Sequence, residues 1–471
     1  MMDKYEMFQQ LLDAAAKEFK LVSRNEAIRV VSHLDADGLS SAAILIKALN
    51  HDGRRYSLST VHQLDEEIIK QLLTEPYNCI FFTDLGSGQF RLIKKYLATK
   101  KVFILDHHQL EEECEAQNIV HVNPHLLGIN GSTEVSGAGV TYLFSKSLNK
   151  ANTNLAHIAI MGAIGDMQED RGFERLNSQI LEDAKKEGKM KVITGLRVFG
   201  AQTKPLHKVI EQSNEYPIPG VTGSESASLM FLQQLGITPR NGSGWKKLVD
   251  LTDDELQKLA TAIILKRLDE EKPEEILGPV YILTQEKKES ALRDAKEFST
   301  LLNACGRLGK ASIGVGACLG NEAIKEKAIK TLASYKREIS NAMNWYKSTS
   351  SGVIKGRGYI IINAEENMMP TIIGTLASII SRSGEVEDGT LILSMAQMIN
   401  GKTKVSLRIG GNGKHDANLR EIMAKIAEPV EGQAGGHYNA AGALIDTDKE
   451  PEFIETAKRI LEMKAMEERV V

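Results

Sequence analysis

A set of Asp and His residues in the first 170 residues has the types and spacing of ligands for divalent metal ions. Its members are His33, Asp35, Asp37, Asp84, Asp106, His107, His108 and Asp166. The first seven come after three apolar runs, residues 28–31, 79–83 and 101–105, which read as short buried strands. Asp166 follows a helical pattern that ends at Gly165. Each motif is weak by itself, because Asp is also common in solvated turns and helix caps.

Converging carboxylates repel one another unless a cation offsets their charge. Mixed Asp and His ligands suit Mn²⁺, with Mg²⁺ or Zn²⁺ as alternatives. Two such ions bridged by one carboxylate are a common device for hydrolysing phosphate esters. The residue types therefore indicate a metal-dependent phosphoesterase, provided that the fold brings them together.

The elements that must position these residues alternate between strands and helices. The predicted strands are residues 28–31, 55–62, 79–83, 101–105 and 119–123; the predicted helices are residues 39–49, 65–73, a segment ending near 97, 139–148 and 154–164. This alternation is typical of an α/β fold with a doubly wound parallel sheet. The strand ends of such a sheet share one edge, so we expect the acidic motifs to meet there.

The rest of the chain divides into further segments. We predict a metal-binding domain at 1–205, a helical insertion at 206–285, a segment at 286–350 that leads back to the cleft and includes a helix connecting the two domains, and a smaller α/β domain at 351–471. A helix over 290–302 should precede Asn303, and glycine loops are expected at 410–413 and 435–436. The insertion could bind a partner protein or be inert, and the lysine-rich stretch 170–206 could be a solvated face or one wall of a nucleic-acid path.

Composition excludes several classes of protein. With 471 residues, 42% apolar and 25% charged, and a net charge of −4, the chain is not a wholly basic nucleic-acid binder, so nucleic acid would need a local basic channel. Its four cysteines lack Cys-x-x-Cys spacing, which indicates reduced thiols and a cytoplasmic location rather than a zinc site or disulfides. The amphipathic, acidic start is not a signal peptide, and no apolar run approaches the ~18 residues of a membrane span.

The ordered motifs resemble those of a known superfamily. In chain order, His33-Leu34-Asp35-Ala36-Asp37-Gly38, Thr83-Asp84, Asp106-His107-His108 and Gly165-Asp166 are similar to the four motifs of the DHH phosphoesterases. Gly435-Gly436-His437 resembles the glycine-rich motif of their DHHA1 partner domain. Asn303-Ala304-Cys305-Gly306-Arg307 resembles the Asn-Ala-x-Gly-Arg motif of the RecJ branch. The whole is most similar to the archaeal RecJ-like group that includes the GINS-associated nuclease.

The resemblance implies roles for these residues. Two ions, most readily Mn²⁺ with Mg²⁺ as the alternative, would be held by two ligand groups: His33 and Asp35 for one, Asp37, His107 and Asp166 for the other, with Asp84 bridging both. Asp106 would orient a histidine through its ring N–H, and His108 would face the scissile phosphate. The substrate contacts, with Arg382 added as a further basic candidate, would be Asn303, Arg307, Arg382, Ser406, Arg408, Gly435, Gly436 and His437. The glycine loop and His437 would face the metal site across a cleft.

The function that follows is a single-strand exonuclease of DNA replication or repair, working 5′ to 3′ on DNA, with RNA left open as a substrate and a GINS subunit implied as a partner. Two alternatives remain. One is a phosphodiesterase for short oligoribonucleotides or cyclic dinucleotides, which His33 keeps open because many RecJ-type nucleases lack it. The other is a scaffold of the replicative helicase, which the intact ligand set argues against.

Overall fold

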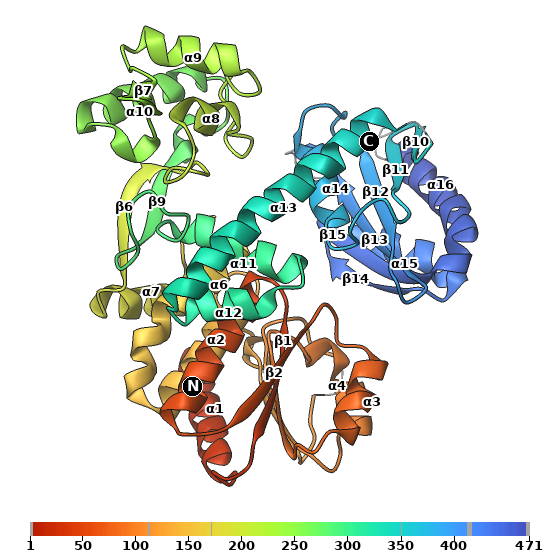
Figure 1. Cartoon of the computed structure of the whole chain (residues 1–471). Coiled ribbons are helices and arrows are strands. Elements are labelled where there is room, and N and C mark those ends of the chain that lie inside the picture. Colours follow the sequence, from red (N-terminus) through yellow and green to blue (C-terminus); the bar gives the residue numbers. More distant parts are fainter. Residues whose placement is uncertain (1–2, 112–113, 171, 350, 412–416, 468–471) are drawn as a thin grey trace. The chain divides into compact units, whose positions relative to one another are not determined.

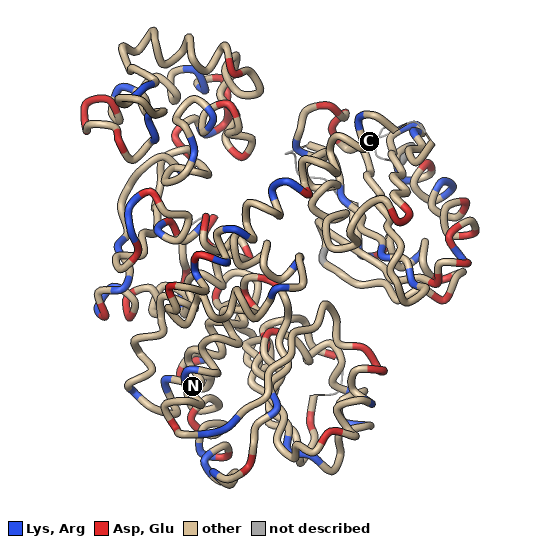
Figure 2. Tube along the Cα trace, viewed as in Figure 1, with Lys and Arg blue, Asp and Glu red and all other residues tan. Residues whose placement is uncertain are grey.

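The computed structural model describes residues 3–111, 114–170, 172–349, 351–411 and 417–467 of the chain. It forms two compact units, Met1–Leu332 and Ala333–Val471, and the division falls within the long helix α13 (Glu322–Ser348) (Figure 1). Figure 2 shows Lys and Arg interspersed with Asp and Glu along both units. Among the helices described, none combines the length and apolar character needed to cross a membrane.

The first unit is built on a five-stranded parallel sheet. Its strands are β1 (Ile28–His33), β2 (Tyr56–Val61), β3 (Cys79–Thr83), β4 (Lys101–Leu105) and β5 (Ile119–Val122), in the order β2-β1-β3-β4-β5. The helices around it are α1 (Lys4–Lys20), α2 (Ala36–His51), α3 (Glu66–Thr74), α4 (Phe90–Tyr96), α5 (Gly137–Leu148) and α6 (Ala156–Gly165). The predicted doubly wound α/β fold is confirmed.

Both faces of this sheet are buried, because successive side chains of a strand point to opposite sides. Phe82 and Ile104 pack with residues of α3 and α4 on one face. On the other face the rings of Phe81 and Phe103 stack with centroids 4.5 Å apart, and Phe19 of α1 meets Phe81 edge-on at 5.1 Å. A fully buried Phe side chain contributes about 2 kcal/mol through removal of its surface from water. The sheet is therefore a firm base for residues at its edge.

A two-stranded ribbon, which the sequence did not predict, connects this domain to the insertion. After α7 (Arg175–Lys186), β6 (Met190–Leu196) pairs antiparallel with β9 (Leu277–Leu283). No strand was predicted at β6, because its partner strand lies more than 80 residues away in the chain and local periodicity does not reveal such a pairing. Between the two strands lie α8 (Leu206–Glu211), α9 (Glu225–Gln234), the hairpin β7 (Arg240–Asn241) and β8 (Gly244–Trp245), and α10 (Asp253–Lys266). These elements share their own apolar core, so the insertion is a small folded module.

The chain then returns to the first domain through α11 (Ala295–Arg307) and α12 (Ala311–Cys318). The predicted helix, 290–302, was wrong at both ends. The Asp294 side chain caps α11 by accepting from the backbone N–H groups of Lys296 and Glu297, so the helix starts later. It continues through Asn303 to Arg307. Near its end, Gly306 lets the helix approach the β1–α2 turn closely.

The second unit contains a six-stranded mixed sheet in the order β10-β11-β12-β13-β15-β14. Its strands are β10 (Val353–Gly356), β11 (Tyr359–Asn363), β12 (Leu391–Gln397), β13 (Lys402–Ile409), β14 (Gln433–His437) and β15 (Ala440–Asp446). Its helices after α13 are α14 (Ile373–Arg382), α15 (Leu419–Ala427) and α16 (Glu450–Glu467). The smaller α/β domain is as predicted in class.

The glycine pair of this unit differs from its prediction as a loop. Gly435 and Gly436 lie in strand β14, paired with Gly442 and Ala441. An added Cβ at Gly436, where φ is +129°, would lie 2.4 Å from the Ala440 carbonyl oxygen. The pairing of β14 with β15 therefore requires glycine at this position. Of the other predicted loop, residues 412 and 413 lie outside the described residues.

Candidate metal centre

Strand register places the acidic motifs of the first unit at one edge of its sheet. Ser32 pairs with Thr83, and Thr83 pairs with Leu105. The residues that come next in the chain are His33, Asp84 and Asp106. All three therefore lie at the edge of the sheet formed by the carboxyl ends of the strands. Asp84 adopts a left-handed backbone with φ of +58°, while its N–H still bonds to the Leu105 carbonyl at 2.9 Å. Asp tolerates this conformation better than most residues, and such outliers cluster at functional sites.

Asp37 is fixed by the start of another helix. It lies in the first turn of α2 and is fully buried. Its two carboxylate oxygens accept hydrogen bonds from the backbone N–H groups of Gly137 and Ala138, at 2.7 and 3.0 Å. These N–H groups begin α5, where helix N–H groups lack partners within the helix. The carboxylate therefore has a fixed orientation.

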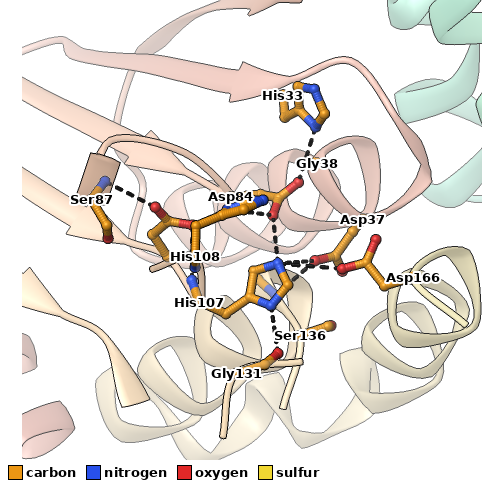
Figure 3. A network of polar contacts seen from close by, with 12 residues as sticks. His33, Asp37, Gly38, Asp84, Ser87, His107, His108, Gly131, Ser136 and Asp166 are labelled. Atoms are coloured by element: carbon orange, nitrogen blue, oxygen red, sulfur yellow. Dashed lines mark hydrogen bonds and ion pairs between the residues drawn. The ribbon is translucent and has the colours of Figure 1, made fainter. Parts of the chain in front are cut away.

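His107 lies at the centre of a carboxylate cluster (Figure 3). Its Nε2 lies 3.3 Å from Asp84 Oδ1, 3.3 Å from Asp166 Oδ2 and 3.7 Å from Asp37 Oδ2. Its Nδ1 is 2.7 Å from the Gly131 carbonyl oxygen. A carbonyl can only accept, so Nδ1 carries the proton and Nε2 of the neutral ring keeps a free lone pair. His107 is thus oriented as a metal ligand would be.

His33 forms a second group with two carboxylates. Its Nδ1 lies 2.9 Å from Asp35 Oδ2 and 3.5 Å from Asp84 Oδ2. The other oxygen of Asp35 caps α2 by accepting from the Gly38 N–H at 2.9 Å. Asp84 therefore contacts both groups, one through each carboxylate oxygen.

Asp106 and His108 lie beside these two groups. His108 Nδ1 is 2.7 Å from Asp106 Oδ1, and the other oxygen of Asp106 accepts from the Ser87 N–H at 2.9 Å. Asn123 donates to both Ser87 Oγ and the His108 carbonyl. The contact with Asp106 directs Nε2 of His108 away from this carboxylate, and the ring is 37% exposed. The Nε2 side of the His108 ring is therefore not engaged by Asp106; that His108 faces a substrate stays a prediction.

The donor set fits divalent cations. Three groups of side chains bring their ligand atoms within 4.8 Å of one another: His33, Asp35 and Asp84; Asp37, His107 and Asp166; Asp84, His107 and His108. The short contacts of both Asp84 oxygens, His33 Nδ1 and His107 Nε2 lack hydrogen-bond geometry, so these buried atoms have no hydrogen-bond partner among the described residues. Buried polar atoms are rarely left unpaired. Cations bound by these atoms would satisfy them.

The electrostatics support the same conclusion. Burial raises the pKa of Asp37 well above its usual value, and the charges of Asp84 and Asp166 raise it further. Burial also raises the pKa of Asp166 to about 7. Burial opposes charge on His107, but Asp84 and Asp166 lift its pKa well above the usual value. The cluster favours bound protons or cations over bare negative charge.

Glycines pack against the carboxylates, and sequence reasoning missed them. A Cβ at Gly137 would lie 2.6 Å from Asp84 Oδ1, and one at Gly162 would lie 2.3 Å from Asp37 Oδ1. Their contacts join segments some 50 to 130 residues apart, so spacing alone does not reveal them. The Ser136 cap of α5, followed by small residues, was the available signal.

The predicted substrate contacts lie on α11 and in the second unit. Asn303 and Arg307 are on α11, and Arg382 is the last residue of α14. Ser406 is buried on β13, where Arg408 donates from Nε to Ser378 Oγ at 3.1 Å. Gly435, Gly436 and His437 are on β14, the His437 side chain being outside what the structure describes. That the residues of the second unit face the metal centre stays a prediction.

Comparisons with known proteins identify the family. The DHH family N-terminal domain matches residues 27–164, the DHH-CID domain 198–278 and the DHHA1 domain 357–463. The uncharacterised protein MJ0831 of Methanocaldococcus jannaschii is 31% identical over 471 residues, 98% of this chain and 99% of the relative. The chain belongs to the DHH/DHHA1 superfamily. Proteins of the DHH superfamily are generally phosphoesterases.

Solved structures share the fold of this DHH/DHHA1 chain. Exonuclease RecJ bound to manganese has a TM-score of 0.57 and 19% identity, over 96% of this chain and 94% of RecJ. CDC45 from Entamoeba histolytica has a TM-score of 0.63 and 12% identity, over 98% of both chains. The RecJ-like resemblance predicted from the motifs is thereby confirmed at the level of fold. The fold alone does not separate a nuclease from a CDC45-like protein.

Proposed function

We propose that this chain is a divalent-metal-dependent phosphodiesterase that removes nucleotides from the end of single-stranded nucleic acid, from the 5′ end on DNA. The observation that carries the proposal is the cluster of Asp and His side chains. It combines carboxylates of fixed orientation, an oriented imidazole, and buried oxygen and nitrogen atoms that have no hydrogen-bond partner among the described residues. CDC45 shares the fold, so fold similarity supports the proposal less than this site does.

Six residues would hold two ions, with Mn²⁺ as the first candidate and Mg²⁺ as the second. His33 and Asp35 would bind one, Asp37, His107 and Asp166 the other, and Asp84 would bridge them. When bound, such ions activate water and neutralise charge on a phosphoryl group. RecJ, a fold relative, has been solved with manganese.

The chain itself would supply orientation and protons. Asp106 holds His108 through Nδ1, so Nε2 can donate to a phosphate oxygen of the bound strand when the ring is charged. Arginine suits phosphate because its planar guanidinium offers several donors at once. We assign binding of the nucleic-acid strand to Arg307 and, in the second unit, to Arg382, Arg408, Ser406, Gly435, Gly436 and His437.

A strand-end assay tests this proposal. Linear DNA labelled at its 5′ end should release labelled mononucleotide early in Mn²⁺, matching 3′-labelled DNA should release its label late, and circular single-stranded DNA should stay intact. Binding of the DNA strand should weaken as the salt concentration rises, because it depends on a few positively charged side chains near the site. Rapid cutting of the circle would indicate an endonuclease and contradict the proposal.

The same assay separates the alternatives. A length series from dinucleotide upward, in DNA and RNA, should show preference for longer strands; activity confined to dinucleotides or cyclic dinucleotides would favour the small-substrate enzyme. A folded protein that binds Mn²⁺ but hydrolyses none of these would favour the scaffold. The complete ligand cluster is the observation that favours an enzyme.

The resemblance to archaeal RecJ-like nucleases also leads us to propose a GINS subunit as a protein partner. We expect the purified proteins to form a complex near micromolar concentration, measured by calorimetry or co-elution. Absence of association at that concentration would remove this partner and leave the nuclease proposal intact.

A further inference from the structure

Helix α11 contacts the turn that carries the His33 and Asp35 ligands. The backbone N–H of Ala36 donates to Asn303 Oδ1 at 3.0 Å. One turn later on α11, a Cβ at Gly306 would lie 1.7 Å from the Leu34 carbonyl oxygen, so the helix backbone rests directly on the turn. These two contacts lie on either side of Asp35.

The hydrogen bond with Asn303 satisfies a group that would otherwise lack a partner. Ala36 is the first residue of α2, and the first N–H groups of a helix have no acceptor within it. Asp35 already uses Oδ1 to cap this helix at Gly38 and directs Oδ2 toward His33. The orientation of Asp35 thus depends on where the start of α2 is held.

The same helix packs against the turn before Asp166. A Cβ at Gly165 would lie 2.7 Å from the Ala36 Cβ and 3.0 Å from Ser299 Oγ on α11. Both ligand-bearing turns are therefore in close contact with each other and with α11, which lies about 270 residues beyond the first of them in the chain.

We infer that Asn303 is a positioning residue for the ion held by His33 and Asp35, and not a contact to the nucleic acid as its motif suggested. This inference rests on the proposed metal centre. Its Oδ1 is occupied by the Ala36 N–H, and the asparagine is half-buried against the turn. Residues that orient metal ligands from behind typically change metal affinity by about 10–100-fold when they are replaced.

The test measures Mn²⁺ binding by calorimetry without substrate. We expect wild type to bind two ions, and Asn303→Ala to bind one of them about 10–100-fold more weakly. Asn303→Asp keeps an acceptor oxygen and should restore the affinity. Thr300→Ala is the matched control, because the Thr300 hydroxyl on the same helix donates to the Lys296 carbonyl of its own helix; this variant should bind Mn²⁺ as wild type does.

Kinetics separate positioning from substrate contact. In Asn303→Ala, excess Mn²⁺ should restore kcat, with KM for an oligonucleotide unchanged. Unchanged Mn²⁺ affinity, with a KM that stays high at saturating Mn²⁺, would overturn the inference. Wild-type protein that binds no Mn²⁺ would instead refute the proposed metal centre, so the two failures are distinguishable.

Discussion

Replacing Asp84 with alanine should lower phosphodiester hydrolysis by at least about 10³-fold at saturating Mn²⁺. Its two oxygens face the two ligand groups, at 3.5 Å from His33 Nδ1 and 3.3 Å from His107 Nε2. Loss of the shared carboxylate leaves no organised pair of ions, and a metal ion contributes several kcal/mol of transition-state stabilisation, where each 1.4 kcal/mol is a factor of ten. The rate on a labelled single strand measures the effect.

The fold should survive this change. Asp84 lies at the sheet edge, and its backbone N–H keeps the Leu105 carbonyl as partner. Holding alanine in the left-handed backbone conformation destabilises the folded state by on the order of 1 kcal/mol, which is far less than the stabilisation from the buried core. Asp65→Ala is a suitable control, since it removes a carboxylate that caps α3 by accepting from the Ile68 N–H; its activity should match wild type. Near-normal hydrolysis by folded Asp84→Ala would contradict the two-ion site.

Replacing Gly162 with alanine should lower hydrolytic activity by about 10–100-fold. Gly162 is not itself a proposed metal ligand, but the added methyl group would displace the Asp37 carboxylate, which is one. The added Cβ would lie 2.3 Å from Asp37 Oδ1 and 2.6 Å from the Ala138 Cβ. Replacing a glycine in a helix with alanine stabilises the helix by about 1 kcal/mol, whereas overpacking the site destabilises the fold by about 1–3 kcal/mol. We therefore expect a net destabilisation. Mn²⁺ affinity and thermal unfolding measure the two consequences.

Gly88→Ala is the matched control for Gly162→Ala. An added Cβ there meets no atom of the described residues within 4 Å, and the residue is exposed near the same sheet edge. It should keep wild-type activity and Mn²⁺ affinity. A folded Gly162→Ala protein indistinguishable from this control would show that Asp37 is not held as the structure places it.

The sheet edge at which the acidic motifs meet was predictable because its signals are local. The apolar runs of β3 and β4 are short, bounded by polar residues, and followed at once by Asp84 and Asp106. A parallel sheet then forces the strand ends together. His33 is the last residue of β1 and so lies at the same edge, which means that convergence of the motifs needed no long-range information.

The supporting contacts were not predictable, because they join distant segments. Asp37 meets the start of α5 about 100 residues later, and Asn303 meets Ala36 across 267 residues. The latter contact is the basis of our inference about Asn303, whose motif resembles a substrate contact while its side-chain oxygen accepts from the Ala36 N–H. The β6–β9 ribbon was missed for the same physical reason, since its strands find their partners only in the folded chain.

Anomalous diffraction at the manganese edge, from crystals grown with Mn²⁺, tests the central claim most directly. We predict two peaks about 3.5–4 Å apart, one beside His33 and Asp35, the other beside Asp37, His107 and Asp166, with Asp84 between them. A single peak away from Asp84, or no peak at this sheet edge in Mn²⁺-saturated crystals, would contradict the two-ion centre and the function built on it.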